Sequence, residues 1–219
     1  MYFLIAELKE DHRTFAELLS KNYITLHIKI KNMREEKDIW EAMVSGEDYV
    51  ASHPELIRRL RITREKLWEF NNLRPSEEEK QKAILRELLG GFGAHFQVNQ
   101  PFRCDFGENI YIGENFFANF NLTILDEAEV KFGDNVFIGP NVSIYTACHP
   151  LEVERRNQLI EWAEPVRIGD NVWIGGSTTI LPGVTIGDNV VIGAGSVVTK
   201  DIPSNVVAVG NPARVIKKL

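Results

Sequence analysis

The sequence predicts a mainly β fold: a left-handed parallel β-helix built from hexapeptide repeats, with a helical N-terminal cap. Between residues 166 and 198 an aliphatic residue opens every hexad, and glycine directly follows four of these heads. A second short side chain stands two places before each head. A six-residue period fits neither an α-helix nor a plain alternating strand, whereas three hexads make one coil of a β-helix. The heads are Ile168, Ile174, Ile180, Ile186, Ile192 and Val198.

The N-terminal part of the chain divides into two segments. Residues 1–32 combine apolar residues at helical spacing with a strand-like alternation. They are either an added helix and strand or sequence that lies upstream of a start at Met33. Residues 33–95 are expected to form the helical cap.

Local signals within the cap predict where its helices begin and end. Ser52 followed by Pro54 is typical of a capped first turn. The run Ser76–Glu79 has the pattern of a capping box and predicts the start of a second helix. Gly90-Gly91 predicts its end, because a helix C-terminus favours a residue with positive φ.

Residues 96–219 are predicted to form the β-helix and a C-terminal tail. The hexads begin near Ile112, slip by two residues at 126–128 and resume as far as Ile144. Residues 146–165 then leave the pattern and are expected to form a long loop. Long excursions from a regular scaffold are where functional residues concentrate.

Composition narrows the class of protein. A hydrophobic fraction of 44% and a charged fraction of 26% are those of an ordinary globular protein. The net charge of −6 argues against nucleic acid as a partner, because binding nucleic acid requires a basic face. No apolar run reaches the length of a membrane span, and Cys104 and Cys148 form no CxxC pair. We therefore expect a cytoplasmic protein with free thiols and no membrane partner.

His149 is the candidate catalytic residue. Of the five histidines, it alone lies within the hexad region, at the start of the long loop. A neutral imidazole titrates near operating pH and can act as a general base. Glu161, on the returning arm of the same loop, is expected to orient His149 through Nδ1–H. The alternative for Glu161 is an ordinary surface carboxylate.

Two other chemistries fit the sequence poorly. A zinc site between coils needs three imidazoles, and the hexad region offers one, so no metal is expected. Cys148 adjoins His149. Neighbours in an extended chain point to opposite sides, so His149 is poorly placed to activate that thiol.

Two surface features suggest contacts with an extended anionic ligand. Trp173 interrupts the small residues of its coil and is predicted to project outward, either toward such a ligand or into a subunit interface. Four basic residues gather near the C-terminal end, where they suit a polyphosphate or simply form a solvated basic tail. They are Lys200, Arg214, Lys217 and Lys218.

Several longer runs resemble the maltose/galactoside O-acetyltransferases of the hexapeptide-repeat superfamily. They are ANFNLTILD (118–126), FIGPNVSIYTACHP (137–150), the run 172–203 and GNPARVIK (210–217). In addition, GEDYVASHPEL with WEFNNLRPSEEEK is similar to that family's helical cap. The resemblance covers residues 34 to 219.

The resemblance implies an acetyl-CoA-dependent enzyme that forms a homotrimer with active sites between subunits. It places the catalytic histidine at His149. Acceptor-site positions fall on Asp105, Asn119, Asp126 and Glu127, and positions on the coenzyme side fall on Trp173, Gly176, Ala194, Thr199, Lys200 and Arg214. An acidic acceptor contact of some members falls near Ala51 here, which leaves the sugar preference open.

The expected function is transfer of acetyl from acetyl-CoA to a hydroxyl of a sugar such as maltose, glucose or a galactoside. The expected route is direct transfer in a ternary complex, with His149 as general base. Another hydroxyl acceptor, such as an antibiotic, a serine or a lipo-oligosaccharide, is the alternative enzyme. A non-catalytic β-helix scaffold is the alternative from another class.

Overall fold

The structure, a computed structural model, describes residues 39–219. The expectations for residues 1–32 and for the start of the cap fall outside this range. Within it, residues 42–219 form one compact unit. No helix in the described part of the chain is long and apolar enough to cross a bilayer.

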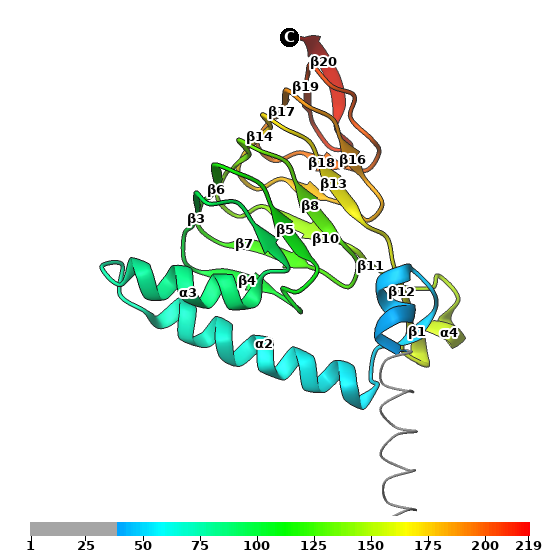
Figure 1. Cartoon of the computed structure of the whole chain (residues 1–219). Coiled ribbons are helices and arrows are strands. Elements are labelled where there is room, and N and C mark those ends of the chain that lie inside the picture. Colours follow the sequence, from blue (N-terminus) through cyan, green and yellow to red (C-terminus); the bar gives the residue numbers. More distant parts are fainter. Residues whose placement is uncertain (1–38) are drawn as a thin grey trace, which may run out of the picture. The chain divides into compact units, whose positions relative to one another are not determined.

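The cap contains a short strand and two long helices (Figure 1). Strand β1 spans Tyr49–Val50, helix α2 spans Pro54–Asn72 and helix α3 spans Glu78–Leu88. Leu67 and Phe70 of α2 and Leu85 of α3 are buried in one apolar cluster that also contains the side chains inside the coils. The cap therefore extends the core of the β-helix.

The ends of these helices correct three local predictions. His53, and not Ser52, is the N-cap of α2, and its side chain accepts a hydrogen bond from the backbone of Glu55. Helix α3 has Glu77 as N-cap and no side-chain cap bond, so the predicted capping box does not form. Leu89, in an extended conformation, ends α3. The chain therefore enters the first strand of the coils without a left-handed residue at Gly90-Gly91.

The coils form three parallel faces, confirming the predicted β-helix. Face 1 contains β2 (Gly91–Phe92), β5 (Ile110–Ile112), β8 (Val130–Phe132), β13 (Val166–Ile168) and β16 (Thr185–Ile186). Face 2 contains β3 (Phe96–Val98), β6 (Phe116–Ala118), β9 (Phe137–Ile138), β14 (Trp173–Ile174), β17 (Val190–Ile192), β19 (Val206–Val209) and the antiparallel β20 (Arg214–Lys218). Face 3 contains β4 (Phe102–Cys104), β7 (Leu122–Leu125), β10 (Ser143–Tyr145), β15 (Thr179–Ile180) and β18 (Val197–Val198).

The hexad heads stack in register because each face pairs the same position of successive coils. On face 2, Ile174 lies between Ile138 and Ile192 and is fully buried. A single hexad cannot bury its aliphatic residue, but neighbouring coils bury a continuous column. The two-residue slip at 126–128 is accommodated in a corner, because Val130 still pairs with Val166 on face 1.

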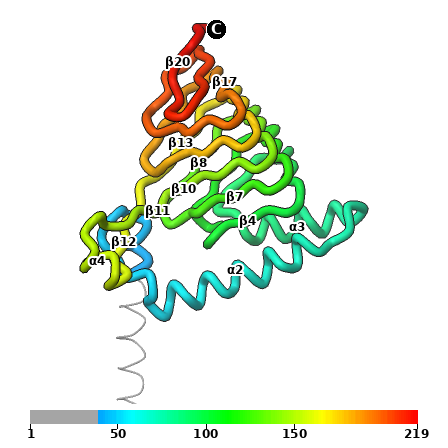
Figure 2. The backbone as a smooth tube through the Cα atoms, turned by 180° about the vertical axis from the view of Figure 1, so that it is seen from behind, coloured from blue at the N-terminus to red at the C-terminus, as the bar shows by residue number. Residues whose placement is uncertain are grey.

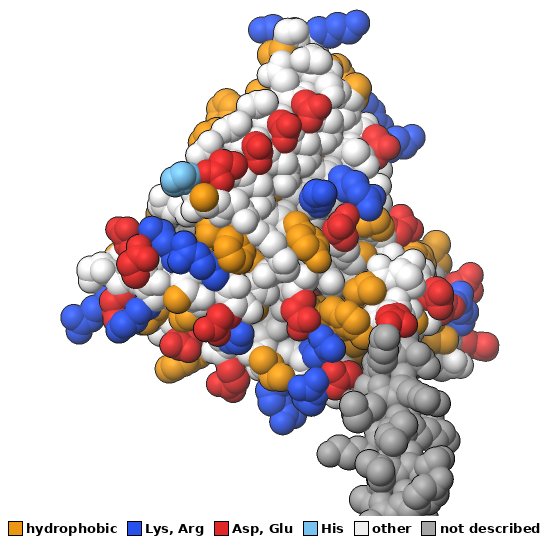
Figure 3. Space-filling view, viewed as in Figure 1, with side chains coloured by type: hydrophobic (Ala, Val, Ile, Leu, Met, Phe, Trp, Pro, Cys, Tyr) orange, Lys and Arg blue, Asp and Glu red, His pale blue; other side chains and the backbone are white. Residues whose placement is uncertain are grey.

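The corner between faces 1 and 2 carries a ladder of acidic side chains, visible in Figure 3 as a diagonal row across the coils. Within it, Asp134, Asp170 and Asp188 each accept a hydrogen bond from the backbone N–H of the acidic residue one coil below, at 2.7 to 2.8 Å. The asparagine that follows each acid has positive φ, which asparagine tolerates better than most residues. The ladder consists of Glu114, Asp134, Asp170 and Asp188.

The predicted long loop leaves the stack between faces 3 and 1 (Figure 2). It contains β11 (Ala147–Cys148), helix α4 (Val153–Asn157) and β12 (Ile160–Ala163). Strands β11 and β12 form an antiparallel pair, and β1 of the cap adds to β12 as a third strand. The loop is thus a hairpin attached to the cap.

Candidate active site

The hairpin places His149 and Glu161 at the corner between faces 3 and 1, which we call the 3–1 corner. It comprises the turns after β4, β7, β10, β15 and β18. His149 directly follows β11, and 57% of its side chain is exposed. Glu161 lies on β12 and is 15% exposed. The antiparallel pairing of Cys148 with Trp162 brings these two arms of the loop together.

His149 and Glu161 face each other. The His149 Nδ1 atom lies 3.5 Å from Oε1 of Glu161, and the other carboxylate oxygen, Oε2, accepts a 2.8 Å hydrogen bond from the hydroxyl of Tyr49. A carboxylate at Nδ1 favours the tautomer that carries its proton there and leaves Nε2 as the basic nitrogen. The geometry therefore suits an imidazole base that is oriented by a carboxylate and has more than half of its side chain exposed.

Three further acidic residues lie at the 3–1 corner, in the turns after β4 and β7. Asp126 is fully buried, and its Oδ1 accepts hydrogen bonds from the backbone N–H groups of Asp105 at 3.0 Å and Phe106 at 2.9 Å. Among residues 39–219, its Oδ2 finds no hydrogen-bond partner. Glu127 is 8% exposed and bonds Asp105 through their side chains. Asp105 is the most accessible of the three carboxyl groups.

Burial changes the protonation of this cluster. It raises the pKa of Asp126 to about 7, against the opposing effect of the backbone donors. It raises the pKa of Glu127 to about 9, and the charge of Asp105 adds to the rise. Two carboxylates in contact cannot both ionise cheaply, so Glu127 holds a proton at neutral pH and can donate it in a hydrogen bond to Asp105. The pair can both donate and accept hydrogen bonds.

Sequence reasoning missed two residues at this corner. Tyr49 lies in the cap, 112 positions before Glu161, and no local pattern links the two. Thr146 is fully buried; its hydroxyl lies 2.8 Å from the carbonyl of Leu125 and accepts from the N–H of Ala128 at 3.0 Å. Thr146 follows Tyr145, which pairs with Leu125, so it stands beside Asp126 of the preceding coil, and the hexad pattern does not mark this position.

A second candidate region lies on face 2 and on the corner between faces 2 and 3, which we call the 2–3 corner. A groove of about 450 Å³ brings together Asn119, Trp173, Gly176 and Ala194, four of the predicted site residues. Trp173 is 58% exposed, which confirms that it projects outward. Phe137, one coil below Trp173, is 50% exposed and extends the apolar wall.

Glycine builds the floor of this groove because the coils approach each other there. A Cβ atom at Gly139 would lie 2.5 Å from the backbone nitrogen of Gly176. One at Gly175 would lie 2.5 Å from the nitrogen of Ala194. These contacts are closer than real Cβ atoms tolerate, so glycine keeps the coils stacked and leaves backbone accessible along the groove.

The remaining predicted residues lie near the end of the stack. Thr199 and Lys200 follow β18, at the 3–1 corner of the last coil, and both are exposed. Arg214 begins β20 and pairs with Val209 across the turn at the 2–3 corner, where it is also exposed. None of the three lines the groove.

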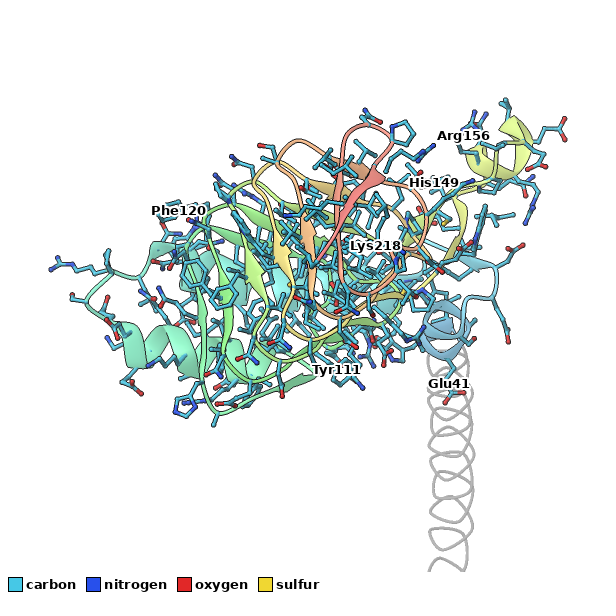
Figure 4. All side chains as sticks on the ribbon, turned by 90° about the horizontal axis from the view of Figure 1, so that it is seen from above. Glu41, Tyr111, Phe120, His149, Arg156 and Lys218 are labelled. Carbon is cyan, nitrogen blue, oxygen red and sulfur yellow. The ribbon has the colours of Figure 1, made fainter. Side chains whose placement is uncertain are left out.

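The two regions occupy different corners of one chain. Figure 4 shows His149 at one side of the coil and Phe120, the neighbour of Asn119, at the other. The histidine with its carboxylates therefore belongs to one corner, and the glycine-lined groove to another. Among residues 39–219 no group of three or more His, Cys, Asp or Glu side chains could hold a metal ion.

Two family profiles match this chain. The maltose acetyltransferase hexapeptide capping motif matches residues 42–93, and the bacterial transferase hexapeptide (six repeats) matches residues 165–200. The first covers the cap with β1, α2 and α3, and the second covers coils that form part of the groove.

Curated relatives and solved structures match over most of the chain. A putative acetyltransferase of Saccharomyces cerevisiae is 57% identical over 182 residues, which are 83% of this chain and 93% of the relative. The galactoside O-acetyltransferase of Escherichia coli is 50% identical over 70% of this chain and 75% of its own length. A maltose O-acetyltransferase structure from Clostridium difficile has a TM-score of 0.82 at 54% identity, covering 83% of this chain and 97% of its own.

A structure of galactoside acetyltransferase in complex with coenzyme A has a TM-score of 0.79 at 45% identity, covering 82% of this chain and 90% of its own. The agreement extends over the cap, the coils and the hairpin together, and it rests on both sequence and structure. The chain therefore belongs to the maltose/galactoside O-acetyltransferase family of hexapeptide-repeat acyltransferases.

Proposed function

We propose that this protein transfers the acetyl group of acetyl-CoA to a hydroxyl of a small sugar. The single observation that carries the proposal is the pairing of an exposed imidazole with a carboxylate: His149 Nδ1 lies 3.5 Å from Glu161, and more than half of the His149 side chain is exposed. Relatives named for maltose and galactoside O-acetylation, one of them in complex with coenzyme A, support the reaction and the donor. The acidic corner supports a polyhydroxyl acceptor, because its carboxyls can both donate and accept hydrogen bonds.

His149 is the proposed general base. Its Nε2 accepts the proton of the sugar hydroxyl as that oxygen attacks the thioester carbon. When the carbon–sulfur bond breaks, the imidazolium returns the proton to the departing thiolate, so the enzyme ends the cycle unchanged. Glu161 stabilises the imidazolium through Nδ1–H, and no covalent acetyl-enzyme is required.

The groove fits the coenzyme. The indole of Trp173 offers an exposed aromatic wall beside a glycine-lined floor, and Ala194 leaves room next to it. The backbone N–H of Gly176 is the proposed donor to the developing oxyanion; such a donor is typically worth about 3 kcal/mol. Thr199, Lys200 and Arg214 are the proposed contacts for the phosphates, as exposed polar and basic groups near the end of the stack.

A homotrimer with active sites between subunits is part of the proposal. In one chain His149 and the groove lie at different corners, so neither corner alone holds base and donor. A threefold arrangement that sets the 3–1 corner of one subunit against the 2–3 corner of the next would complete three equivalent sites. On the acceptor side, Asn119 would then come from one subunit, and Asp105, Asp126 and Glu127 from the other.

Replacing His149 tests the chemical role. We expect His149→Ala to lower kcat by about 10²- to 10⁴-fold, the usual contribution of a general base, with sedimentation and coenzyme A affinity unchanged. His95→Ala is the matched control, since His95 is exposed on another corner, where its partner is Glu114. Thiol release from acetyl-CoA, measured with a panel of sugars, reports the rate and identifies the acceptor. A His149→Ala variant with more than about a tenth of the wild-type kcat would refute the assignment.

A further inference from the structure

The cap is joined to the catalytic loop by one short strand. Strand β1 runs antiparallel to β12, with Tyr49 opposite Glu161 in the register. Just beyond this pair the N–H of Ala51 donates to the carbonyl of Leu159 at 2.9 Å. On the other side Asp48 forms an ion pair with Arg155 of helix α4. The family's capping segment thus makes direct contact with the arm that carries Glu161.

Tyr49 uses this strand to reach the carboxylate. Its side chain is 3% exposed, and its hydroxyl donates to Oε2 of Glu161 at 2.8 Å. The other oxygen, Oε1, is the one that faces Nδ1 of His149. The two oxygens of Glu161 therefore have different partners, one from the cap and one from the loop.

The surroundings keep Tyr49 in the role of donor. Burial raises the pKa of its phenol, and the negative charges of Glu127, Glu161 and Asp105 raise it further. The phenol therefore stays protonated at neutral pH and acts as a hydrogen-bond donor. A neutral buried hydroxyl needs an acceptor, and Glu161 supplies it.

We propose that Tyr49 is a positioning residue for catalysis: its hydroxyl fixes the carboxylate of Glu161, and Glu161 in turn holds the imidazole of His149. The proposal rests on the proposed role of His149 as general base. The imidazole is more than half exposed, so packing alone does not hold it. A carboxylate fixed at one oxygen loses the freedom to rotate about its terminal bond, and the ring facing its other oxygen is held with it.

This relay gives the capping segment a catalytic function beyond closing the lower end of the coils. The contact spans 112 residues of sequence, and it leaves only Glu161 between a cap residue and the imidazole of His149. Hydrogen bonds to a charged partner are the stronger class, which makes this one worth retaining in a buried position.

Tyr49→Phe tests the relay by removing one oxygen atom and keeping the ring. We expect kcat to fall about tenfold, the scale of one hydrogen bond to a carboxylate, with KM for both substrates and the melting temperature close to wild type. Glu161→Gln should lower kcat by at least as much. In the Glu161→Gln background Tyr49→Phe should have little further effect, because both changes interrupt the same chain of contacts.

Asp48→Asn is the matched control. It weakens the attachment of the same strand to the same hairpin and leaves the hydroxyl and Glu161 untouched. We expect it to keep wild-type kcat. Wild-type kcat in Tyr49→Phe, or independent multiplication of the Tyr49 and Glu161 effects, would overturn the relay. If His149→Ala stays active, the proposed function fails instead, and the two failures are therefore distinguishable.

Discussion

Mixed trimers offer a quantitative test of the proposed homotrimer with sites divided between subunits. One parent carries His149→Ala, which removes the proposed base at the 3–1 corner and leaves the groove intact. The other carries Ala194→Trp, which fills the groove from an exposed position and leaves the base intact. Each parent alone should have almost no activity, because every site in a homotrimer then contains the same defect.

The expected recovery follows from the geometry. A site between subunits needs an intact base from one chain and an intact groove from its neighbour. After denaturation, equal mixing and reassembly, about one quarter of all sites combine the two intact halves. The mixture should therefore recover about a quarter of the wild-type kcat per site, whereas a site contained within one chain recovers none, since every chain has one defect.

The measurement is thiol release from acetyl-CoA at saturating substrates, with the mixing ratio varied. Activity should pass through a maximum at equal proportions, because the product of the two fractions is largest there. A mixture that stays at the level of its parents, with trimers confirmed by sedimentation, would refute the division of the site between corners. Mixing each parent with wild type controls for losses during reassembly.

Three further outcomes are expected. Ile174→Ala, which opens a hole in a buried column, should destabilise the protein to denaturant by about 3 kcal/mol, whereas Ile216→Ala at an exposed edge should cost under about 0.5 kcal/mol. Burial raises the pKa of Asp126 to about 7, above its unfolded value, so its charge costs stability as pH rises. The melting temperature of Asp126→Asn should therefore rise relative to that of wild type as the pH increases from about 5 to about 7. A difference in melting temperature that stays constant over this range would contradict the prediction. Replacing Lys200 and Arg214 together should raise KM for acetyl-CoA, leave KM for the sugar unchanged, and reduce the salt dependence of KM for acetyl-CoA. If KM for acetyl-CoA is unchanged in a variant that still forms the proposed trimer, neither residue contacts the coenzyme.

The hexad pattern predicted the coils because stacking is a repetitive, nearly local property. A head such as Ile174 needs only the equivalent residues one coil above and below, and these occur at a fixed spacing in the sequence. The long loop was recognised because residues 146–165 interrupt the hexad repeat, and His149 lies near the start of this interruption. The outward position of Trp173 was predicted because this residue interrupts the small side chains of its coil.

Helix ends were less predictable, because several residues compete for the same role. Ser52 and Ser76 have good capping chemistry, yet the N-cap positions are occupied by His53 and Glu77. The orientation in which each helix packs against the coils determines which residue becomes its N-cap. Local preference is worth only about 1 kcal/mol there, and packing of the apolar faces outweighs it.

The sequence by itself determined that coils form, where the long loop interrupts them and that His149 lies at the start of this loop. Only the tertiary structure decided which side chains surround His149. The pairing of Tyr49 with Glu161 joins residues 112 positions apart through a strand of two residues, too short to recognise from its pattern. The full burial of Asp126 likewise depends on the turn after β4 folding over it. In the coils, each residue packs against equivalent residues at a fixed spacing in the sequence. The pairing of β1 with β12 joins distant segments, so it depends on how the cap and the loop pack together.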